Sequence, residues 1–473
     1  MQEEAGLTVE LHLKVAYRMT CDRPTVPSIR FGTAQSLQRH FHRAVCLRRV
    51  GFSHERSLDV PLKESLKMFF TQASTYPPRA ILIALCFIPP LQTAWGAGPV
   101  KIAMTAEHWK TTGEVEFVAT EGFPEGILAA KQGNAALKDM PFTNGTIEFD
   151  VKLLGHGIPG IRFRQRDLET AEEVYLRPGP DCPASQDCIQ YTPLTHGIPL
   201  WDIYPEYQAM APIRPEGWNH IKMVVSGRRM NIFVNGATSP TLAVGRLEGD
   251  ALGGAIKLHG PASFANLTVT PDEVDGLSPQ PVTDPTDSDG RYIRNWSVSA
   301  PSVLPSEMDP VFKELTGKDR NYGDLPVESP SWKKLVAERK GMVNLTREFG
   351  STKTGSVIDV AWLKTTIESD RDQKKHASIG WAREIWVYVN GKQVFAGRNL
   401  YDPPEGRKSP DGRLSLENGA FDLPLRKGLN EIAIALDDNF PDGGAHHFGW
   451  GLEMRLDDLD GIKVSTEQII RED

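Results

Sequence analysis

Residues 144–151 read Asn-Gly-Thr-Ile-Glu-Phe-Asp-Val, and apolar and charged side chains alternate along them. A period of two is typical of a β-strand with one face in a core and the other in water. The same period recurs at 218–225, and a third such stretch at 230–234 runs into Asn235-Gly236, a strong signal for a two-residue hairpin turn. These stretches predict an antiparallel sheet in this part of the chain.

The second half of the chain repeats these signals. Residues 385–389 alternate and end at Asn390-Gly391, and further alternating stretches follow at 430–436 and 449–456. The chain has 42 glycines and 35 prolines, as a protein with many turns requires. The sequence therefore predicts an all-β protein built from two β-sandwich domains of the jelly-roll type.

A segment rich in proline and aspartate divides the chain. Residues 273–290 contain no basic residue and almost no large apolar one, which indicates an acidic linker. It separates a predicted domain at 98–272 from another at 291–465, since 473 residues are too many for one ordinary domain. Within the second domain, Ser331 to Arg339 is expected to form one helix, capped by Ser331.

The first 97 residues differ from the rest. Residues 68–97 are predicted to be a secretory signal peptide, because an apolar run at 80–88 is broken by Pro89-Pro90 and followed by small residues. That run is shorter than the ~20 residues that a membrane-spanning helix needs. We interpret 1–67 as an extension upstream of the true start. The mature chain is then expected to be exported to the periplasm, cell surface or medium, without a membrane span, and to be bacterial.

Cysteine usage agrees with export. Of five cysteines, only Cys182 and Cys188 lie beyond the predicted signal, and they flank the polar stretch Pro-Ala-Ser-Gln-Asp. Two cysteines that close a short loop in an oxidising compartment are expected to form a disulfide. A metal site would need a second pair of cysteines or histidines at ligand spacing, which the sequence does not offer nearby.

Charge and motif content exclude several classes of function. The formal net charge is −8, whereas broad nucleic-acid binding needs a basic surface that neutralises phosphates. The sequence also lacks a phosphate-binding loop and the serine elbow of esterases. Neither nucleic acid nor a nucleotide is therefore expected as a partner.

Several short motifs carry a resemblance to known families. They are Asn-Gly-Thr-Ile-Glu-Phe-Asp at 144–150, Ile-Arg-Phe-Arg at 161–164, Gly-Trp-Asn at 217–219, Val-Asn-Gly at 234–236 and Phe-Ala-Asn-Leu at 264–267. Residues 98–272 thereby resemble concanavalin A-like, laminin-G-like jelly-roll domains, notably the 3-keto-disaccharide hydrolase-like group. The hairpin Trp-Val-Tyr-Val-Asn-Gly-Lys at 386–392 and the segment 425–431 are similar to galactose-binding-like β-sandwiches.

One pair of carboxyl groups in the first domain invites a catalytic interpretation. Period-two geometry places Glu148 and Asp150 on one strand face, and laminarinase-like hydrolases of similar fold use a Glu-x-Asp strand followed by a second glutamate. Retaining glycosidases need two carboxyl groups about 5 Å apart. Here Lys152 and Leu153 occupy the positions of that second glutamate. We therefore reject this mechanism and expect a solvated outer face.

Arginines and aromatic residues gather between residues 160 and 205. Arg162, Arg164 and Arg166 are expected on one strand face, where guanidinium groups could bind hydroxyl or carboxylate groups, while aromatic rings stack on sugar rings. The alternative is that the rings pack in the core and the arginines form surface ion pairs. The predicted ligand-binding residues are Arg162, Arg164, Tyr175, Arg177, Tyr191, Trp201 and Tyr204.

Weaker candidates exist for acid–base chemistry and for a metal. His196, Asp202 and Glu206 could act as acid–base groups if the chain is an enzyme. Clustered aspartates on sandwich loops could hold a structural calcium ion, although solvated turns are the favoured alternative because aspartate is a common turn residue. No cofactor is required. The calcium candidates are Asp437, Asp438, Asp457, Asp458 and Asp460.

Three functions follow from these observations. The first is an exported carbohydrate-binding protein that recognises a glycan or glycoside on an arginine- and aromatic-lined face of the first sandwich. The second is a glycoside-degrading enzyme, hydrolase or lyase, of the 3-keto-disaccharide hydrolase-like type. The third is an adhesion or scaffold module that binds protein. A deep pocket around Arg164 and His196 with two close carboxylates would favour catalysis, and an open groove would favour binding.

Overall fold

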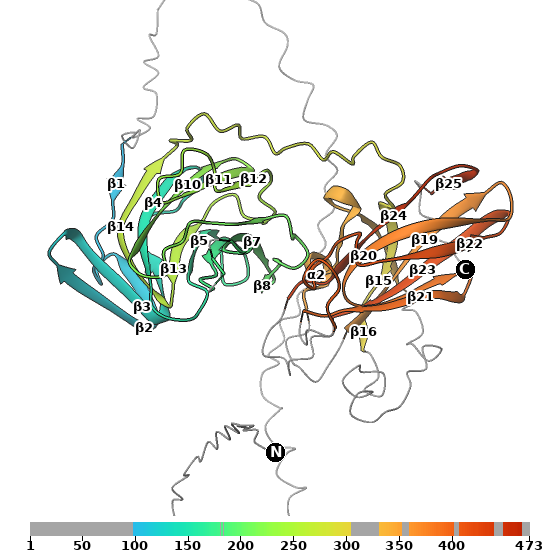
Figure 1. Cartoon of the computed structure of the whole chain (residues 1–473), viewed down its shortest axis with the longest axis horizontal. Coiled ribbons are helices and arrows are strands. Elements are labelled where there is room, and N and C mark those ends of the chain that lie inside the picture. The colour runs from blue at the N-terminus through green and yellow to red at the C-terminus, as the bar shows by residue number, and fades with distance from the viewer. Residues whose placement is uncertain are drawn as a thin grey trace, which may run out of the picture. The chain divides into compact units, whose positions relative to one another are not determined.

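The computed structural model describes residues 98–179, 181–182, 184–303, 331–351, 359–401, 406–438 and 448–465, all within one compact unit, Pro90–Asp473. The described residues form two curled antiparallel sheets (Figure 1), which confirms the predicted all-β, jelly-roll fold class. No helix in these ranges is long and apolar enough to cross a membrane. The predicted extension and signal peptide, 1–97, lie outside the described residues.

The first sheet has fourteen strands in the order β12-β11-β10-β4-β14-β3-β13-β5-β6-β7-β8, with β1 on β14, β2 on β3 and β9 on β7. The strands are β1 Val100–Lys101, β2 Trp109–Thr120, β3 Phe123–Leu137, β4 Gly145–Leu153, β5 Gly160–Gln165, β6 Ala171–Leu176, β7 Ile189–Thr195, β8 Ile198–Pro199, β9 Gln208–Ala209, β10 Trp218–Ser226, β11 Arg229–Val234, β12 Leu242–Val244, β13 Ala255–His259 and β14 Ala262–Pro271.

The alternation read from the sequence sets the inner face of this sheet. Ile147, Phe149 and Val151 of β4 are at most 4% exposed, while Glu148 and Asp150 between them are partly exposed. Strand β4 pairs with β10 on one side and β14 on the other, so its apolar face lies at the centre of the sandwich. Burial of one such large apolar side chain stabilises the fold by about 1.5–3 kcal/mol.

The second sheet has eleven strands in the order β17-β15-β19-β23-β20-β24-β18, with β16 and β25 on β19 and with β21 and β22 on β20. The strands are β15 Asn295–Ser299, β16 Ser302–Val303, β17 Trp332–Val336, β18 Val343–Asn344, β19 Asp359–Ser369, β20 Gln373–Val389, β21 Lys392–Asn399, β22 Gly419–Leu425, β23 Gly428–Asp437, β24 Gly451–Leu456 and β25 Ile462–Val464.

Both predicted Asn-Gly turns form, but only one of them is a two-residue hairpin. Asn235 and Gly236 have φ of 52° and 74°, and Asn390 and Gly391 have φ of 50° and 77°, the left-handed values that a turn of type I′ requires. Asn390-Gly391 connects β20 directly to β21, with Val389 opposite Lys392. After Asn235-Gly236, by contrast, the next strand, β12, begins at Leu242 and pairs with β11 at Ile232, so the hairpin predicted there is a turn within a longer loop.

The helix predicted at 331–339 is wrong. Residues Trp332–Val336 form β17, which pairs with β15 over its whole length. The Lys364 ammonium lies 5.0 Å from the centre of the Trp332 ring, so contacts across the sheet outweigh the weak helical preference of a short segment. The α-helix in the described residues is instead α2, Leu345–Phe349, capped by the Asn344 side chain.

The acidic segment between the sheets contains no strand and is held in place. The N–H of Arg228 donates to the carbonyl of Pro279 (3.0 Å), and the N–H of Val282 donates to that of Gly245 (2.9 Å). The Asp284 carboxylate accepts a hydrogen bond from the N–H of Lys340 at 2.9 Å. Residues 273–290 thus bond to both halves of the chain, and the domain limits at 98–272 and 291–465 stay a prediction.

The two halves also share apolar packing. Met342, Ala382 and Leu414, which follow the acidic segment, belong to the same buried cluster as the core of the first sheet. The second sheet has a core of its own, built around Trp296, Trp381 and their neighbours. Apolar side chains from both sandwiches therefore pack against one another.

Candidate functional site

The three arginines of the predicted strand face lie in three different surroundings. Arg164 has a φ of 49°, and the pairing of β5 with β13 is irregular opposite it, so the alternation of sides breaks there. The Arg164 side chain is 1% exposed and donates to the carbonyls of Thr143 and Gly227. Arg162 instead pairs with Glu173, and Arg166 is exposed. The expectation of one shared face is wrong.

Tyr175, Arg177 and Trp201 are brought together around residues of the second sandwich. The Trp201 ring packs edge-on against Tyr401 at 4.8 Å between centroids, and the Arg413 guanidinium lies 5.0 Å from the Trp201 centroid. Arg177 donates to the Tyr401 hydroxyl at 3.1 Å. Tyr175 and Trp201 are each 6% exposed, so these rings pack inside the protein rather than present a face to solvent.

Tyr191 belongs to a buried acidic network. Its hydroxyl donates to Glu172 at 2.7 Å and accepts the N–H of Glu248 at 2.6 Å. Burial raises the pKa of Glu172 to about 7, against the opposing effects of Tyr191 and the nearby Arg164 and Arg228. Burial likewise raises the pKa of Glu248. These carboxyl groups lie inside the protein, and burial there favours their neutral, protonated form over the charged form.

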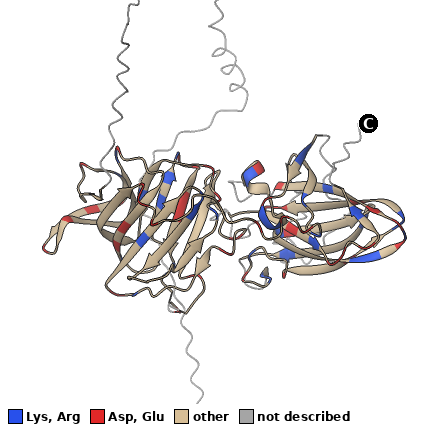
Figure 2. Cartoon of the chain, turned by 90° about the horizontal axis from the view of Figure 1, so that it is seen from above, with Lys and Arg blue, Asp and Glu red and all other residues tan. Residues whose placement is uncertain are grey.

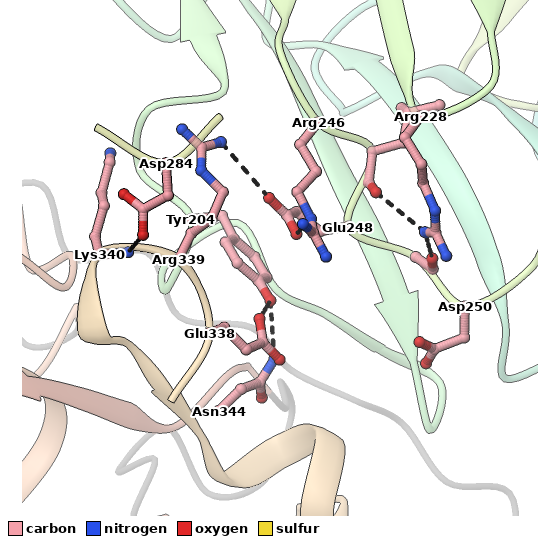
Figure 3. A network of polar contacts seen from close by, with 12 residues as sticks. Tyr204, Arg228, Arg246, Glu248, Asp250, Asp284, Glu338, Arg339, Lys340 and Asn344 are labelled. Carbon is pink, nitrogen blue, oxygen red and sulfur yellow. Dashed lines mark hydrogen bonds and ion pairs between the residues drawn. The ribbon is translucent and has the colours of Figure 1, made fainter. Parts of the chain in front are cut away.

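Tyr204 links the two sandwiches through polar contacts (Figure 3). Its hydroxyl donates to Glu338 and accepts hydrogen bonds from Asn344 (3.1 Å) and Arg347 (3.3 Å). Arg347 in turn donates to Glu338 at 2.7 Å and pairs with Asp250 of the first sandwich. A ring that the sequence suggested as a sugar platform is thus the centre of a structural junction.

The three acid–base candidates are not brought together. His196 is exposed, and its Nε2 lies 3.2 Å from the carbonyl of Arg347. Asp202 is fully buried and forms a 2.7 Å ion pair with Arg383, which is 1% exposed. Glu206 forms a 2.9 Å ion pair with Lys340.

The calcium candidates lie in two separate places. Asp437 and Asp438 accept backbone N–H groups at the end of β23, whereas Asp458 and Asp460 pair with Lys375 and Arg371. Asp457 is exposed. Within the described ranges, no group of three or more histidine, cysteine or acidic side chains could hold a metal ion. A calcium site stays an untested proposal.

The Glu148–Asp150 face carries a histidine between its carboxylates. His220 Nδ1 lies 2.8 Å from Asp150, and its Nε2 lies 3.7 Å from Glu148. Asn266 donates to Asp150 at 2.7 Å. Burial opposes ionisation of Asp150, but His220 and Asn266 together hold its pKa below the usual value. Lys152 occupies the next outward position, so this face forms ion pairs on a half-exposed surface.

An open hollow of about 820 Å³ lies elsewhere on the first sandwich. Strands β2 and β3 supply Glu114 and residues 131–134, the loop after β4 supplies Leu154 and His156, and the β13–β14 turn supplies residues 259–261. Asn134 and His259 are direct partners in the pairing of β3 with β13. The hollow is therefore lined by hydrogen-bonding side chains, several of which stand on paired strands.

A buried carboxylate, that of Glu173, stands behind His259. The His259 Nε2 lies 2.8 Å from Glu173, which also pairs with Arg162 at 3.0 Å. Burial alone would raise the pKa of Glu173, but His259 and Arg162 outweigh it and hold that pKa at about 2. Gly160 separates His259 from Tyr175, since a Cβ there would lie 2.8 Å from the histidine Nε2 and 2.9 Å from the tyrosine Cβ.

A second hollow, of about 360 Å³, adjoins the cysteine loop. The loop after β4 contributes to it through Gly157 and Ile158, and the other side is formed by Arg177, Asp181 and Asp187. Arg177 pairs with Asp187 at 3.2 Å. The predicted disulfide Cys182–Cys188 is confirmed, with its Cα atoms 5.7 Å apart. One loop thus contributes to both hollows.

The sequence analysis missed the side chains that line the larger hollow. Asn134, His156 and His259 stand in unremarkable stretches, and only the distant pairing of β3 with β13 brings the first and last together. One signal was available. Glu172-Glu173 interrupts an apolar strand, and a charged pair inside such a strand indicates buried partners.

Along the described ribbons, basic and acidic residues lie among uncharged ones in both sheets (Figure 2). Both hollows are lined by residues of both signs, the larger by Glu114 and Lys131 and the smaller by Arg177, Asp181 and Asp187. The hollows therefore present donors and acceptors together.

Comparisons with known proteins find likeness in structure only. The sequence matches no protein-family model, and no curated protein matches it. Solved structures with some likeness include the carbohydrate-binding module CBM66 from Bacillus subtilis, with 15% identity, a TM-score of 0.25, and coverage of 35% of this chain and 93% of that one. Another is a β-glucanase from Bacillus licheniformis, with 8% identity, a TM-score of 0.27, and coverage of 38% and 100%.

A third is the exoplasmic/lumenal domain of VIP36 in a form bound to Ca²⁺ and Man3GlcNAc, with 10% identity, a TM-score of 0.24, and coverage of 36% and 85%. These three proteins are a carbohydrate-binding module, a β-glucanase and a domain solved with a bound glycan. Each match covers little more than a third of this chain, and the function proposed below rests on the residues of the chain itself.

Proposed function

We propose that this chain is an exported protein that binds a saccharide in the 820 Å³ hollow of its first sandwich. The observation that carries the proposal is the lining of this hollow. Asn134 and His156 offer donors and acceptors, and hydroxyl groups of a sugar need both. Lys131, which is paired with Glu114 and Glu116, and His259, whose Nε2 faces Glu173, complete the polar lining. The volume lies within the range of ligand sites, about 300–1,000 Å³.

The cluster behind the hollow supports a rigid site. The Glu173 carboxylate contacts both Arg162 and His259, so the imidazole is held in one place before a ligand arrives. A site whose side chains are already ordered loses less entropy on binding. Arg162 would thus act as a positioning residue rather than a direct ligand, and Arg177 would contact a longer glycan that reaches the second hollow.

A glycan-array screen of the purified protein tests the proposal. His156→Ala and Lys131→Ala remove exposed groups of the hollow, and each lost hydrogen bond is expected to weaken binding about tenfold, or about 1.4 kcal/mol. His108→Ala is the matched control, because His108 is also exposed but does not line the hollow. Absence of binding to every glycan, or binding that both hollow variants leave unchanged, would overturn the proposal and favour a protein-binding role.

A further inference from the structure

A partly open cavity of about 150 Å³ lies where the two sandwiches meet. Tyr204 and Glu206 line it from the first sandwich together with Glu248, and Arg339 and Glu453 line it from the second. A water molecule needs roughly 10–15 Å³ of such space, so the cavity has room for about ten. That is the size of one small ring-shaped molecule rather than of a polymer.

The apolar part of the lining is continuous with the core. Ile203, Met342 and Leu414 are each at most 4% exposed and contribute to the cavity. A sugar ring has apolar C–H faces as well as hydroxyl groups, so a lining of both kinds fits it. A fully apolar ligand would instead remove water from the charged groups without replacing their hydrogen bonds, which is costly.

The polar part of the lining is only partly satisfied by protein. The Glu453 side chain is 8% exposed, and a backbone hydrogen bond from Leu416 reaches its carboxyl group. Arg339 donates to the Tyr207 hydroxyl at 3.2 Å, but its Nε is buried and has no partner among the described residues. Figure 3 shows the Arg339 side chain extended toward Glu248. Buried polar groups of this kind normally find a partner, from protein, water or ligand.

The protonation of Glu453 makes it suited to hydroxyl groups. Burial raises its pKa, Lys340 lowers it, and Glu206 raises it again, with a result of about 7. Near neutral pH the protonated form of this carboxyl group is therefore accessible, and in that form it can donate a hydrogen bond as well as accept one. Lys340, held by Glu206 at 2.9 Å, is a further donor at the cavity.

We propose that this cavity binds a single sugar residue or a similar ring-sized polyhydroxylated molecule, held by Glu453, Arg339 and Lys340 between the two sandwiches. Three acidic side chains, Glu206, Glu248 and Glu453, disfavour an anion there. The class of ligand rests on the proposed function, but the site is separate from the hollow. The ligand is either a free monosaccharide or the end residue of a glycan.

Calorimetric titration of the full chain tests the site and separates these sources. Glucose, galactose, mannose and fructose are titrated singly at millimolar concentration, followed by disaccharides that contain each of them. Binding of a free monosaccharide is expected to fall at least tenfold in Glu453→Ala and Lys340→Ala. Glu417→Ala is the matched control, because Glu417 is exposed and does not line the cavity. A response to the disaccharides alone would identify the end residue of a glycan as the ligand.

Two further variants keep the test informative if an alanine variant folds poorly. Ser415→Leu fills the cavity without removing a charge and should abolish this binding, while His156→Ala in the hollow should leave it unchanged. Glu453→Gln should keep binding and make it independent of pH between 6 and 8, whereas binding to the wild type weakens over that range. No response to any of these sugars, or an affinity that Glu453→Ala and Ser415→Leu leave unchanged, would overturn the proposal. If the cavity binds a sugar but the hollow binds no glycan, only the proposed function is overturned.

Discussion

The hollow and the junction of the two sandwiches use polar residues in opposite ways. In the hollow, the exposed side chains of His156 and Lys131 border open space, and the ion pairs of Lys131 with Glu114 and Glu116 are themselves exposed. At the junction, Tyr204, Asp202 and Trp201 are buried against partners from the other half of the chain. The comparison teaches that aromatic and charged residues in a loop-rich stretch can serve assembly as readily as recognition.

The largest expected effect comes from the buried ion pair at the junction. Asp202→Ala removes a carboxylate that forms a buried ion pair with Arg383, and such changes lower the free energy of unfolding by about 3–5 kcal/mol. Urea unfolding measures this loss. Asp167→Ala, which removes an exposed ion pair with Arg166, is the control and should cost at most about 1 kcal/mol. Equal losses of stability in the two variants would contradict the contrast between buried polar residues at the junction and exposed ones.

The second effect is a dependence of stability on pH that belongs to the buried carboxyls. Glu172 and Glu453 have folded pKa values of about 7, above the usual 4.5, so the folded protein keeps protons that the unfolded chain releases between pH 4.5 and 7. The free energy of unfolding therefore falls as pH rises through this window, by about 3 kcal/mol for each group.

Urea unfolding at pH 5 and pH 8 measures this dependence. Glu453→Gln should reduce the difference in the free energy of unfolding between pH 5 and pH 8 by the part that Glu453 contributes. At pH 8 this variant should be more stable than the wild type. Glu417 is exposed, so Glu417→Gln should change neither the pH dependence of the free energy of unfolding nor the stability at pH 8. A wild-type stability that is equal at pH 5 and pH 8 would show that these carboxyls are ionised throughout.

The disulfide is expected to contribute a smaller amount. Cys182→Ser with Cys188→Ser opens a loop with a sequence separation of 6, and chain entropy predicts a loss of about 2 kcal/mol for so short a loop. Thermal unfolding with and without reductant measures it. Because the loop borders the second hollow, the variant should also weaken binding of longer glycans more than that of short ones. A variant as stable as the wild type would limit the disulfide to shaping the hollow.

The smallest effect on stability is expected in the hollow itself. Lys131→Ala and His156→Ala remove exposed side chains, so each should change the free energy of unfolding by no more than about 0.5 kcal/mol. The same urea experiment checks this. A loss near that of Asp202→Ala would mean that the hollow is a structural element and that its contrast with the junction fails.

Local patterns were enough to predict the strands and turns. The alternation at Ile147, Phe149 and Val151 and the two Asn-Gly turns depend on neighbours in sequence, and they are present. The helix at 331–339 failed because β15 supplies a partner that a local pattern does not contain. Short segments take the structure of their neighbours when propensity is weak.

The candidate site was only partly accessible from the sequence. Tyr175, Arg177 and Trp201 do come together, but Tyr401 and Arg413 from more than 190 positions further along complete the cluster. Asn134 and His259 meet only through the pairing of β3 with β13. Which polar residues face solvent and which face the other sandwich depends on contacts between distant segments, and periodicity carries no information on these.

The ion pair of Asp202 has a consequence for the order of events during synthesis. This carboxylate accepts hydrogen bonds from Arg383 and from the N–H of Gly449, which lie 181 and 247 residues further along the chain. At about 5–20 residues per second, the second partner leaves the ribosome roughly 10–50 s after the acid itself. Until then Asp202 lacks both of these partners, so the buried contacts around it can be completed only after the C-terminal strands have been made.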